Sequence, residues 1–147
     1  MIKTFRGLLG NGAQERIRLQ HIDGKTGYRI RFFGVMANLP GTQSFEGVTK
    51  VYSIKQTVID GVVDFSEQTL LGASFYRENA TSTAPLSQVL IFDRVTFNQD
   101  IFITHKDVSE HGLNLPINYY MELETISLDD IEATAVILKN FRNTNTV

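Results

Sequence analysis

The feature that most constrains the fold of this chain is a series of short segments in which apolar and polar residues alternate. In QERIRLQHI (14–22), Ile17 and Leu19 lie on one side of an extended chain and the arginines on the other. A period of two residues indicates a β-strand with one face in water. The segment TGYRIRFFGVMAN (26–38) has the same pattern, and DGK (23–25) between the two is a turn signal. The sequence therefore predicts a β-hairpin here.

Further segments rich in β-branched and aromatic residues predict more strands. They are GVTKVYSIKQTVI (47–59), QVLIFDRVTF (88–97), QDIFITHKDV (99–108) and INYYMELETI (117–126). The segment 66–78 is ambiguous, because Ser66 is a good cap for a helical turn whereas ASFYRE favours a strand. NATSTAPLS (79–87) is small and polar and contains a proline, which predicts a surface loop.

The last segment, SLDDIEATAVILKNFRN (127–143), has a different period. Its apolar residues Leu128, Ile131, Ala135 and Leu138 recur at helical spacing. Ser127 is a candidate N-cap, and Lys139 and Arg142 lie near the C-terminal end, where the helix dipole favours cations. The pattern predicts a short helix, and the alternative is that AVIL (135–138) forms one more buried strand.

A chain of 147 residues has the usual size of one domain, and no repeat or linker divides it. We therefore predict a single β-rich domain over residues 1–147. Many short strands with closely spaced turns are typical of a β-sandwich or a jelly-roll-like barrel. The expected fold class is all-β with a short C-terminal helix.

Composition argues against several functional classes. The chain has no cysteine, which excludes disulfides, thiolate catalysis and zinc sites built on sulfur. The formal net charge of −2 gives no basic footprint for nucleic acid or for an anionic membrane. No apolar run is long enough for a signal peptide or a membrane span. We expect neither nucleic acid nor membrane as a partner, and a soluble setting without standard secretion.

The histidines do not form a recognised metal motif. His21, His105 and His111 lack a spacing such as HExxH. His105 and Asp107 are two residues apart and share one face of a predicted strand, so the pair is a candidate metal contact. A solvated strand end explains the pair more simply. We predict no metal site.

The sequence signals for a catalytic site are also weak. LLGASF has Tyr76 where the second glycine of a GxSxG elbow belongs. Asp93 and Asp100 flank the junction between two predicted strands, where paired carboxylates serve a glycosidase or bind calcium. Asp residues between strands are more often turn formers. We expect no catalytic residue and no cofactor.

The most distinctive polar feature is a set of four arginines. If segments 14–22 and 26–38 pair, Arg16, Arg18, Arg29 and Arg31 line the outer face of one hairpin. Like charges on one ribbon repel unless acidic groups meet them. These groups are either Asp and Glu of this chain or an acidic surface on a partner.

The stretch FNQDIFITHKDV (97–108) predicts a strand that runs into a turn. Phe97, Ile101 and Ile103 share one face and are expected to pack inward. Phe102, Thr104 and Lys106 share the other face, so an exposed Phe102 would belong to an interface. On this prediction, Phe102→Ala weakens binding to a partner and leaves the isolated fold nearly intact.

Several segments together resemble a family of small virion structural proteins of tailed phages, known especially from marine phages of cyanobacteria. The resemblance extends over nearly the whole chain. It is carried by MIKTFRGLL (1–9), GYRI (27–30), VIDGVVDFSEQTLLGASF (58–75), IFDRVTFNQDIFITHKDV (91–108), NYYMELE (118–124) and TAVILKNFRNTN (134–145).

The resemblance implies a component of the virus particle, and a capsid decoration or cement protein is the first expectation. Such a protein binds the major capsid protein on the outer shell, often as a homotrimer. The expected partners are the major capsid protein or other virion proteins and further copies of the chain in a homo-oligomer. The expected location is the virion, which is assembled in the host cytoplasm. Aromatic and arginine side chains commonly anchor such contacts. The candidate interface residues are Arg16, Arg18, Arg29, Arg31, Phe102 and Tyr120.

Two other roles stay open. The protein is alternatively a neck, tail or baseplate component, although the repeats and long arms common in tail proteins are absent. A carbohydrate-binding β-sandwich on the particle is the third possibility. Sugar sites use exposed aromatic residues, and tryptophan is absent, so Tyr119 and Tyr120 are the candidates.

Overall fold

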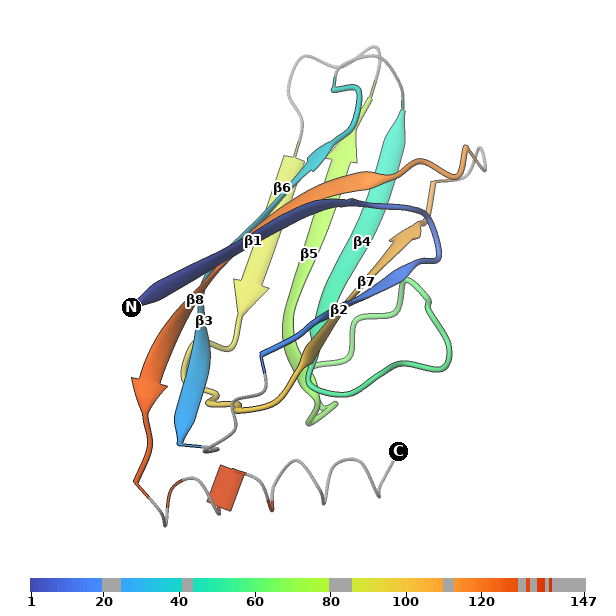
Figure 1. The fold of residues 1–147 in the computed structure, drawn as a ribbon. Helices are drawn as coiled ribbons and strands as arrows, with labels where there is room; N and C mark the ends of the chain where they lie inside the picture. Colours follow the sequence, from blue (N-terminus) through green and yellow to red (C-terminus); the bar gives the residue numbers. More distant parts are fainter. Residues whose placement is uncertain are drawn as a thin grey trace.

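The protein is a β-sandwich of two antiparallel sheets (Figure 1). The computed structural model describes residues 1–19, 25–40, 44–79, 86–109, 113–129, 132, 135, 136 and 138. The strands are β1 (Ile2–Leu9), β2 (Gln14–Ile17), β3 (Thr26–Ala37), β4 (Phe45–Tyr52), β5 (Leu70–Glu78), β6 (Leu86–Ile91), β7 (Ile101–Asp107) and β8 (Ile117–Ser127). The all-β prediction is confirmed.

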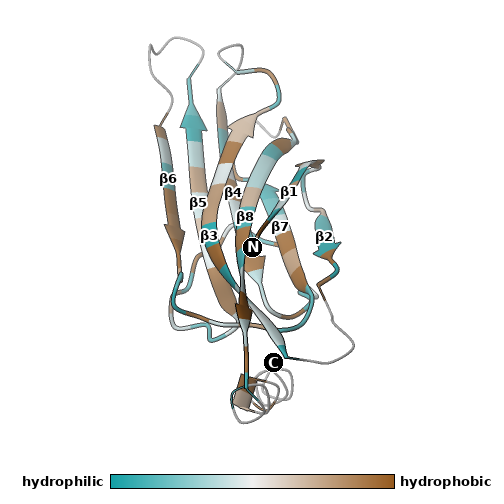
Figure 2. Ribbon diagram, turned by 60° about the vertical axis from the view of Figure 1, so that its left-hand side comes forward, coloured by the Kyte–Doolittle hydropathy of each residue, from teal (hydrophilic) through white to brown (hydrophobic). Residues whose placement is uncertain are grey.

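The two sheets differ in size. One has three strands in the order β1-β8-β3, and the other has five in the order β2-β7-β4-β5-β6. Figure 2 shows β3 and β8 in front of β4 and β5, with β6 and β2 at opposite edges of the larger sheet. The core lies between the two layers, where one face of each sheet excludes water.

Strand alternation explains which side chains fill the core. On β8, Tyr119, Met121 and Leu123 point inward and are buried, while Tyr120 and Glu122 between them point outward. The opposing layer contributes side chains such as Val51, Ile101 and Ile103, all fully buried in the same cluster. Phe97, Ile101 and Ile103 therefore pack inward, as predicted for the stretch 97–108.

The predicted hairpin of 14–22 and 26–38 is wrong. β2 pairs with β7 in the larger sheet, and β3 pairs with β8 in the smaller one. Both strands have the alternation expected of them, but alternation does not specify the pairing partner. The chain changes layers between Ile17 and Thr26 instead of turning back on itself.

Other boundaries also differ from the sequence-based predictions. β1 was not predicted, because its polar and apolar residues occupy both faces. β4 ends at Tyr52, so residues 53–59 of the predicted strand are not extended. They belong to a long connection over residues 53–69, which we call the strap. The segment 66–78 contains β5, and Ser66 caps no helix: its backbone N–H donates to the Asp64 carboxylate over 2.9 Å.

The remaining predictions have mixed outcomes. β8 matches the prediction for 117–126, β7 that for 99–108, and β6 starts two residues early and ends at Ile91. Most of the predicted helix 127–143 lies outside the described residues, as do His21, His111 and positions 80–85 of the predicted loop. Ser127 is not the N-cap, because it ends β8. The Asp129 carboxylate instead accepts from the Glu132 N–H over 2.7 Å, as an N-cap does.

The solvated strand end predicted for His105 and Asp107 is wrong, because His105 is fully buried and both side chains bind the backbone of Leu115. The fully buried His105 ring contacts the Thr49 hydroxyl through Nδ1 over 3.3 Å and donates from Nε2 to the Leu115 carbonyl over 2.9 Å. Asp107 accepts from the Leu115 N–H over 2.8 Å. The two side chains thus hold both peptide groups of Leu115 and fix the segment that leads into β8.

Burial lowers the pKa of His105, because the charged imidazolium is disfavoured away from water. The unfolded chain has a histidine pKa of about 6.5. The contribution of His105 to stability is therefore complete above about pH 6.5 and is lost as the pH falls through the depressed folded pKa. We predict that urea unfolding shows a falling free energy of unfolding between pH 7 and 5.

His105→Gln should flatten that slope, even if it lowers stability at pH 7. The other two histidines are present in both proteins, so their titration cancels in the comparison. An unchanged slope in the variant would contradict a buried neutral His105.

Candidate binding surface

The outer face of the three-stranded sheet carries a group of exposed apolar side chains, which we call the apolar face. It consists of Leu8 on β1, Phe32 and Met36 on β3, and Tyr120 on β8. Their exposed fractions are 53%, 49%, 58% and 37%. Exposed single apolar residues are normal, but a contiguous group on one sheet face is typical of a contact surface.

A β-bulge in β3 places Phe32 on this face. The pairing with β8 shifts between Ile30 and Phe32, so Arg31 is the extra residue. Without the bulge, strict alternation from buried Ile30 would turn Phe32 inward. The bulge therefore moves a large aromatic side chain from the core layer to the surface.

The Phe32 ring lies beside Tyr120 and over Gly34. The two ring centroids are 5.9 Å apart at an interplanar angle of 55°. A Cβ atom at position 34 would lie 3.1 Å from the Phe32 ring, so glycine allows the ring to lie against the sheet. Around these residues is a shallow hollow of about 730 Å³, also lined by Arg6 and Asn118.

Charged groups border the apolar face on one side. Glu122 accepts a hydrogen bond from the Tyr120 hydroxyl over 2.7 Å, and the Arg31 guanidinium lies 4.0 Å from the same carboxylate. This hydrogen bond raises the pKa of the Tyr120 hydroxyl, since ionisation would place two anions together. An apolar centre of aromatic residues, Met and Leu with a charged rim is a composition typical of protein–protein interfaces.

The structure separates the six candidate interface residues predicted from the sequence. Arg31 and Tyr120 meet at Glu122 on the smaller sheet, and Arg29 on the same sheet donates to the Thr96 hydroxyl over 3.1 Å. Arg16 and Phe102 are opposite each other across β2 and β7 in the larger sheet. Arg18 is exposed beyond the end of β2.

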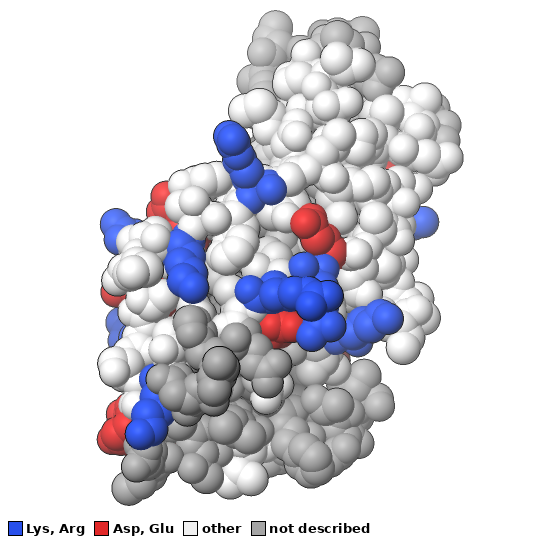
Figure 3. Space-filling model, in the orientation of Figure 1, with Lys and Arg blue, Asp and Glu red and all other residues white. Residues whose placement is uncertain are grey.

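The four arginines therefore do not form one basic ribbon. Arg16 pairs with Asp100 at 2.5 Å, and Asp100 also accepts from the Leu19 N–H. Figure 3 shows the densest group of Lys and Arg side chains in this view, in the region of β2, with acidic side chains directly beside it. For Arg16 and Arg31, carboxylates of this chain supply the acidic partner. Phe102 is half-buried, and its role at an interface stays a prediction.

The other polar side chains that the sequence offered as candidates for catalysis or binding do not gather at one site. Among the residues that the structure describes, no three His, Asp or Glu side chains are placed to hold a metal ion. Asp100 is occupied by Arg16 and Leu19, and His105 by Thr49 and Leu115. Tyr119 is buried and donates to Glu15 over 2.7 Å, so it is not the exposed sugar platform that the sequence suggested.

Sequence reasoning missed Leu8, Phe32 and Met36 as surface residues. The β1 strand was not predicted, and the bulge at Arg31 reverses the face that alternation assigns to Phe32. Of the four residues of the apolar face, the sequence identified only Tyr120, from its position between apolar neighbours in INYYMELETI. The only available signal for the others was Arg31-Phe32-Phe33, where the alternation of β3 breaks.

Comparisons with models of known protein families and with curated proteins gave no match. Within the described residues, no helix is long and apolar enough to cross a membrane.

Adjacent residues of β8 offer a direct check of this geometry. Tyr120→Ala removes an exposed side chain and one ring contact, so the free energy of unfolding should fall by about 1 kcal/mol or less. Met121→Ala opens a cavity in the core and should cost about 2–5 kcal/mol. Urea unfolding of both variants measures the difference. Equal losses would contradict the assignment of the two faces.

Proposed function

We propose that the protein is a structural component of a virus particle, a decoration protein that binds the major capsid protein on the outer shell and stabilises it. The observation that carries the proposal is the apolar face. Four large apolar side chains on the outside of a rigid sheet gain free energy only when a partner removes them from water. The resemblance of the sequence to phage virion proteins supplies the kind of partner.

The architecture suits this role. The apolar face lies on paired strands whose inner sides fill the core, so its shape is set before binding and little conformational entropy is lost. Aromatic residues and Met at the centre supply contact area, and Arg6 and Arg31 at the border supply orientation. Many copies on one shell would multiply a modest single contact.

Binding to capsid shells tests the proposal. Shells assembled from the major capsid protein are mixed with the purified protein and sedimented, and the bound fraction gives the affinity. We predict that Phe32→Ala and Met36→Lys each weaken binding about tenfold or more, as expected for central interface residues.

The control is Val58→Lys on the strap, a residue 71% exposed and outside the apolar face. It adds the same charge as Met36→Lys and should leave binding unchanged. Equal weakening by Val58→Lys would indicate a general charge effect, and full binding by both apolar-face variants would overturn the assignment of this face.

A protein at the neck, tail or baseplate would use the same apolar face and differ only in the partner that it binds.

One observation favours a sugar ligand as a second candidate: the Phe32 and Tyr120 rings share a face with the Asn118 amide. Saturable binding on a glycan array, lost in Phe32→Ala, would support that function. Binding to shells without glycan binding supports the decoration role.

A further inference from the structure

The strand β6 lies at one edge of the five-stranded sheet. Among the residues that the structure describes, it pairs with β5 alone, in a register from Gly72↔Ile91 to Arg77↔Leu86. The N–H and C=O groups of every second residue on an edge strand point away from the sheet. These groups can form hydrogen bonds to another strand.

The other three edge strands carry charges, and β6 carries none. β1 contains Lys3 and Arg6, β2 contains Glu15 and Arg16, and β3 contains arginines and the bulge. Charges and bulges are the usual means by which proteins prevent strand addition at an edge. The sequence of β6, LSQVLI, has only uncharged residues. Of the four edge strands that the structure describes, β6 alone lacks these protections.

The side chains of β6 are exposed on both faces of the sheet. Leu90 points outward, in register with Ala73, and is 44% exposed. Val89 points to the side of the core, in register with buried Ser74, and is still 41% exposed. An uncharged apolar edge strand in contact with water is a predicted site of association. Figure 2 shows this strand at the outer left of the larger sheet.

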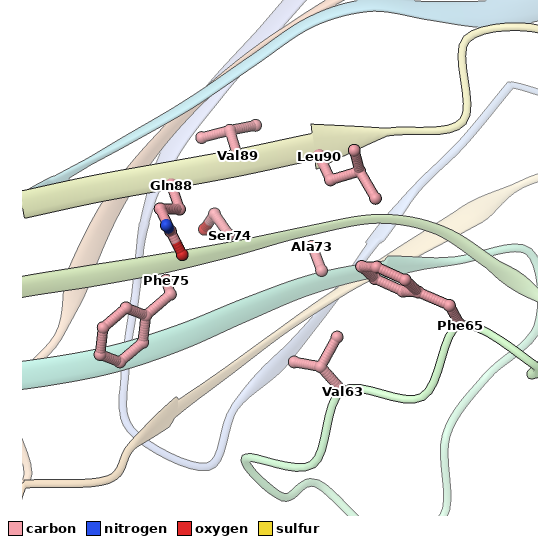
Figure 4. A pocket seen from close by; sticks show the side chains of 8 residues that line it. All are labelled: Val63, Phe65, Ala73, Ser74, Phe75, Gln88, Val89 and Leu90. Carbon is pink, nitrogen blue, oxygen red and sulfur yellow. The ribbon is translucent and has the colours of Figure 1, made fainter.

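A hollow of about 540 Å³ adjoins β6 on the outer face. Figure 4 shows Phe65 from the strap and Leu90 from β6 beside this hollow, near Ala73. Phe65 is 57% exposed and contacts Phe92 edge to face at 5.6 Å. A strand added to β6 would place its outward side chains next to this apolar hollow.

The strap is held in place, so the hollow has a fixed wall. Lys50 on β4 donates from Nζ to the Asp60 carboxylate over 3.0 Å and to the Val62 carbonyl over 2.6 Å. At its other end, the Gln14 side chain makes two hydrogen bonds with the backbone of Gln56. The Lys50 ammonium also lowers the pKa of Asp60, which keeps this carboxylate charged near neutral pH.

We propose that β6 is an oligomerisation edge: two copies of the chain pair their β6 strands antiparallel about a two-fold axis and join their five-stranded sheets into one. Charge selects a second copy as the occupant. In a two-fold pairing, a residue near the axis lies opposite its own copy, so a charge there meets a like charge. β6 has no charged residue, so two copies can pair without this repulsion, and its leucines and valine complement themselves.

The dimer is independent of the proposed function, since β6 and the apolar face lie on different sheets. It would give each assembly two apolar faces, which raises avidity for a shell. All measurements below use the isolated protein without capsid, so their outcome does not depend on shell binding.

Light scattering after size-exclusion chromatography should give twice the chain mass of 16.6 kDa at micromolar concentration. Leu90→Lys and Val89→Lys should each raise the dimer dissociation constant about tenfold or more, because each removes apolar contact and places two like charges within the short paired strands. The control is Ile2→Lys on the edge strand β1, which should leave the dimer intact. A monomer in the unsubstituted protein overturns the proposal.

Single cysteines locate the axis without a large change in side-chain volume, because the chain has no cysteine of its own. Ser87→Cys, Gln88→Cys and Val89→Cys are oxidised separately, with Thr4→Cys on β1 as the control. A residue meets its own copy only near a two-fold axis, so one or two adjacent positions should form disulfide dimers. Cross-linking at no β6 position, or equal cross-linking at Thr4→Cys, would overturn the β6 pairing.

Discussion

The fold depends on the apolar contact between the two sheets. The inner faces of β3 and β8 provide Ile30, Phe33, Met121 and Leu123, and these pack against Val51, Ile101 and Ile103 of the larger sheet. Because a strand alternates its faces, this one contact also decides what points outward. Because Met121 points into the core from β8, the adjacent Tyr120 points to the outer side of the sheet. The apolar face is therefore a consequence of the core together with the bulge at Arg31.

Buried and partly buried polar groups connect strands to the neighbouring loops. His105 and Asp107 on β7 hold Leu115, Asp100 holds both Arg16 and Leu19, and Lys50 holds the strap through Asp60 and Val62. Each contact satisfies a group that would be costly to bury alone. Asp100, His105 and Asp107, which the sequence offered as candidate ligands, are thus engaged in positioning loops.

The sequence predicted the class of the fold because the period of two is a local property. The buried face of FNQDIFITHKDV and the strand at 117–126 could be read directly from it. Pairing is not local: alternation in 14–22 was correct for β2, yet its partner β7 is more than eighty residues away, and the intervening DG signal suggested a hairpin. The bulge in β3 needed the register with β8 to be recognised. For this reason Tyr120 was found from the sequence, and Phe32 and Met36 were not.

The central claim is that the outer face of the three-stranded sheet binds a virus shell. Cryo-electron microscopy of virions that contain this protein tests it most directly, because the sandwich is asymmetric enough to orient in a map. We predict density on the outside of the head, with β1, β8 and β3 toward the capsid protein and Phe32 at the contact. Density at the neck or tail, or density on the head with this face toward solvent, would contradict the account.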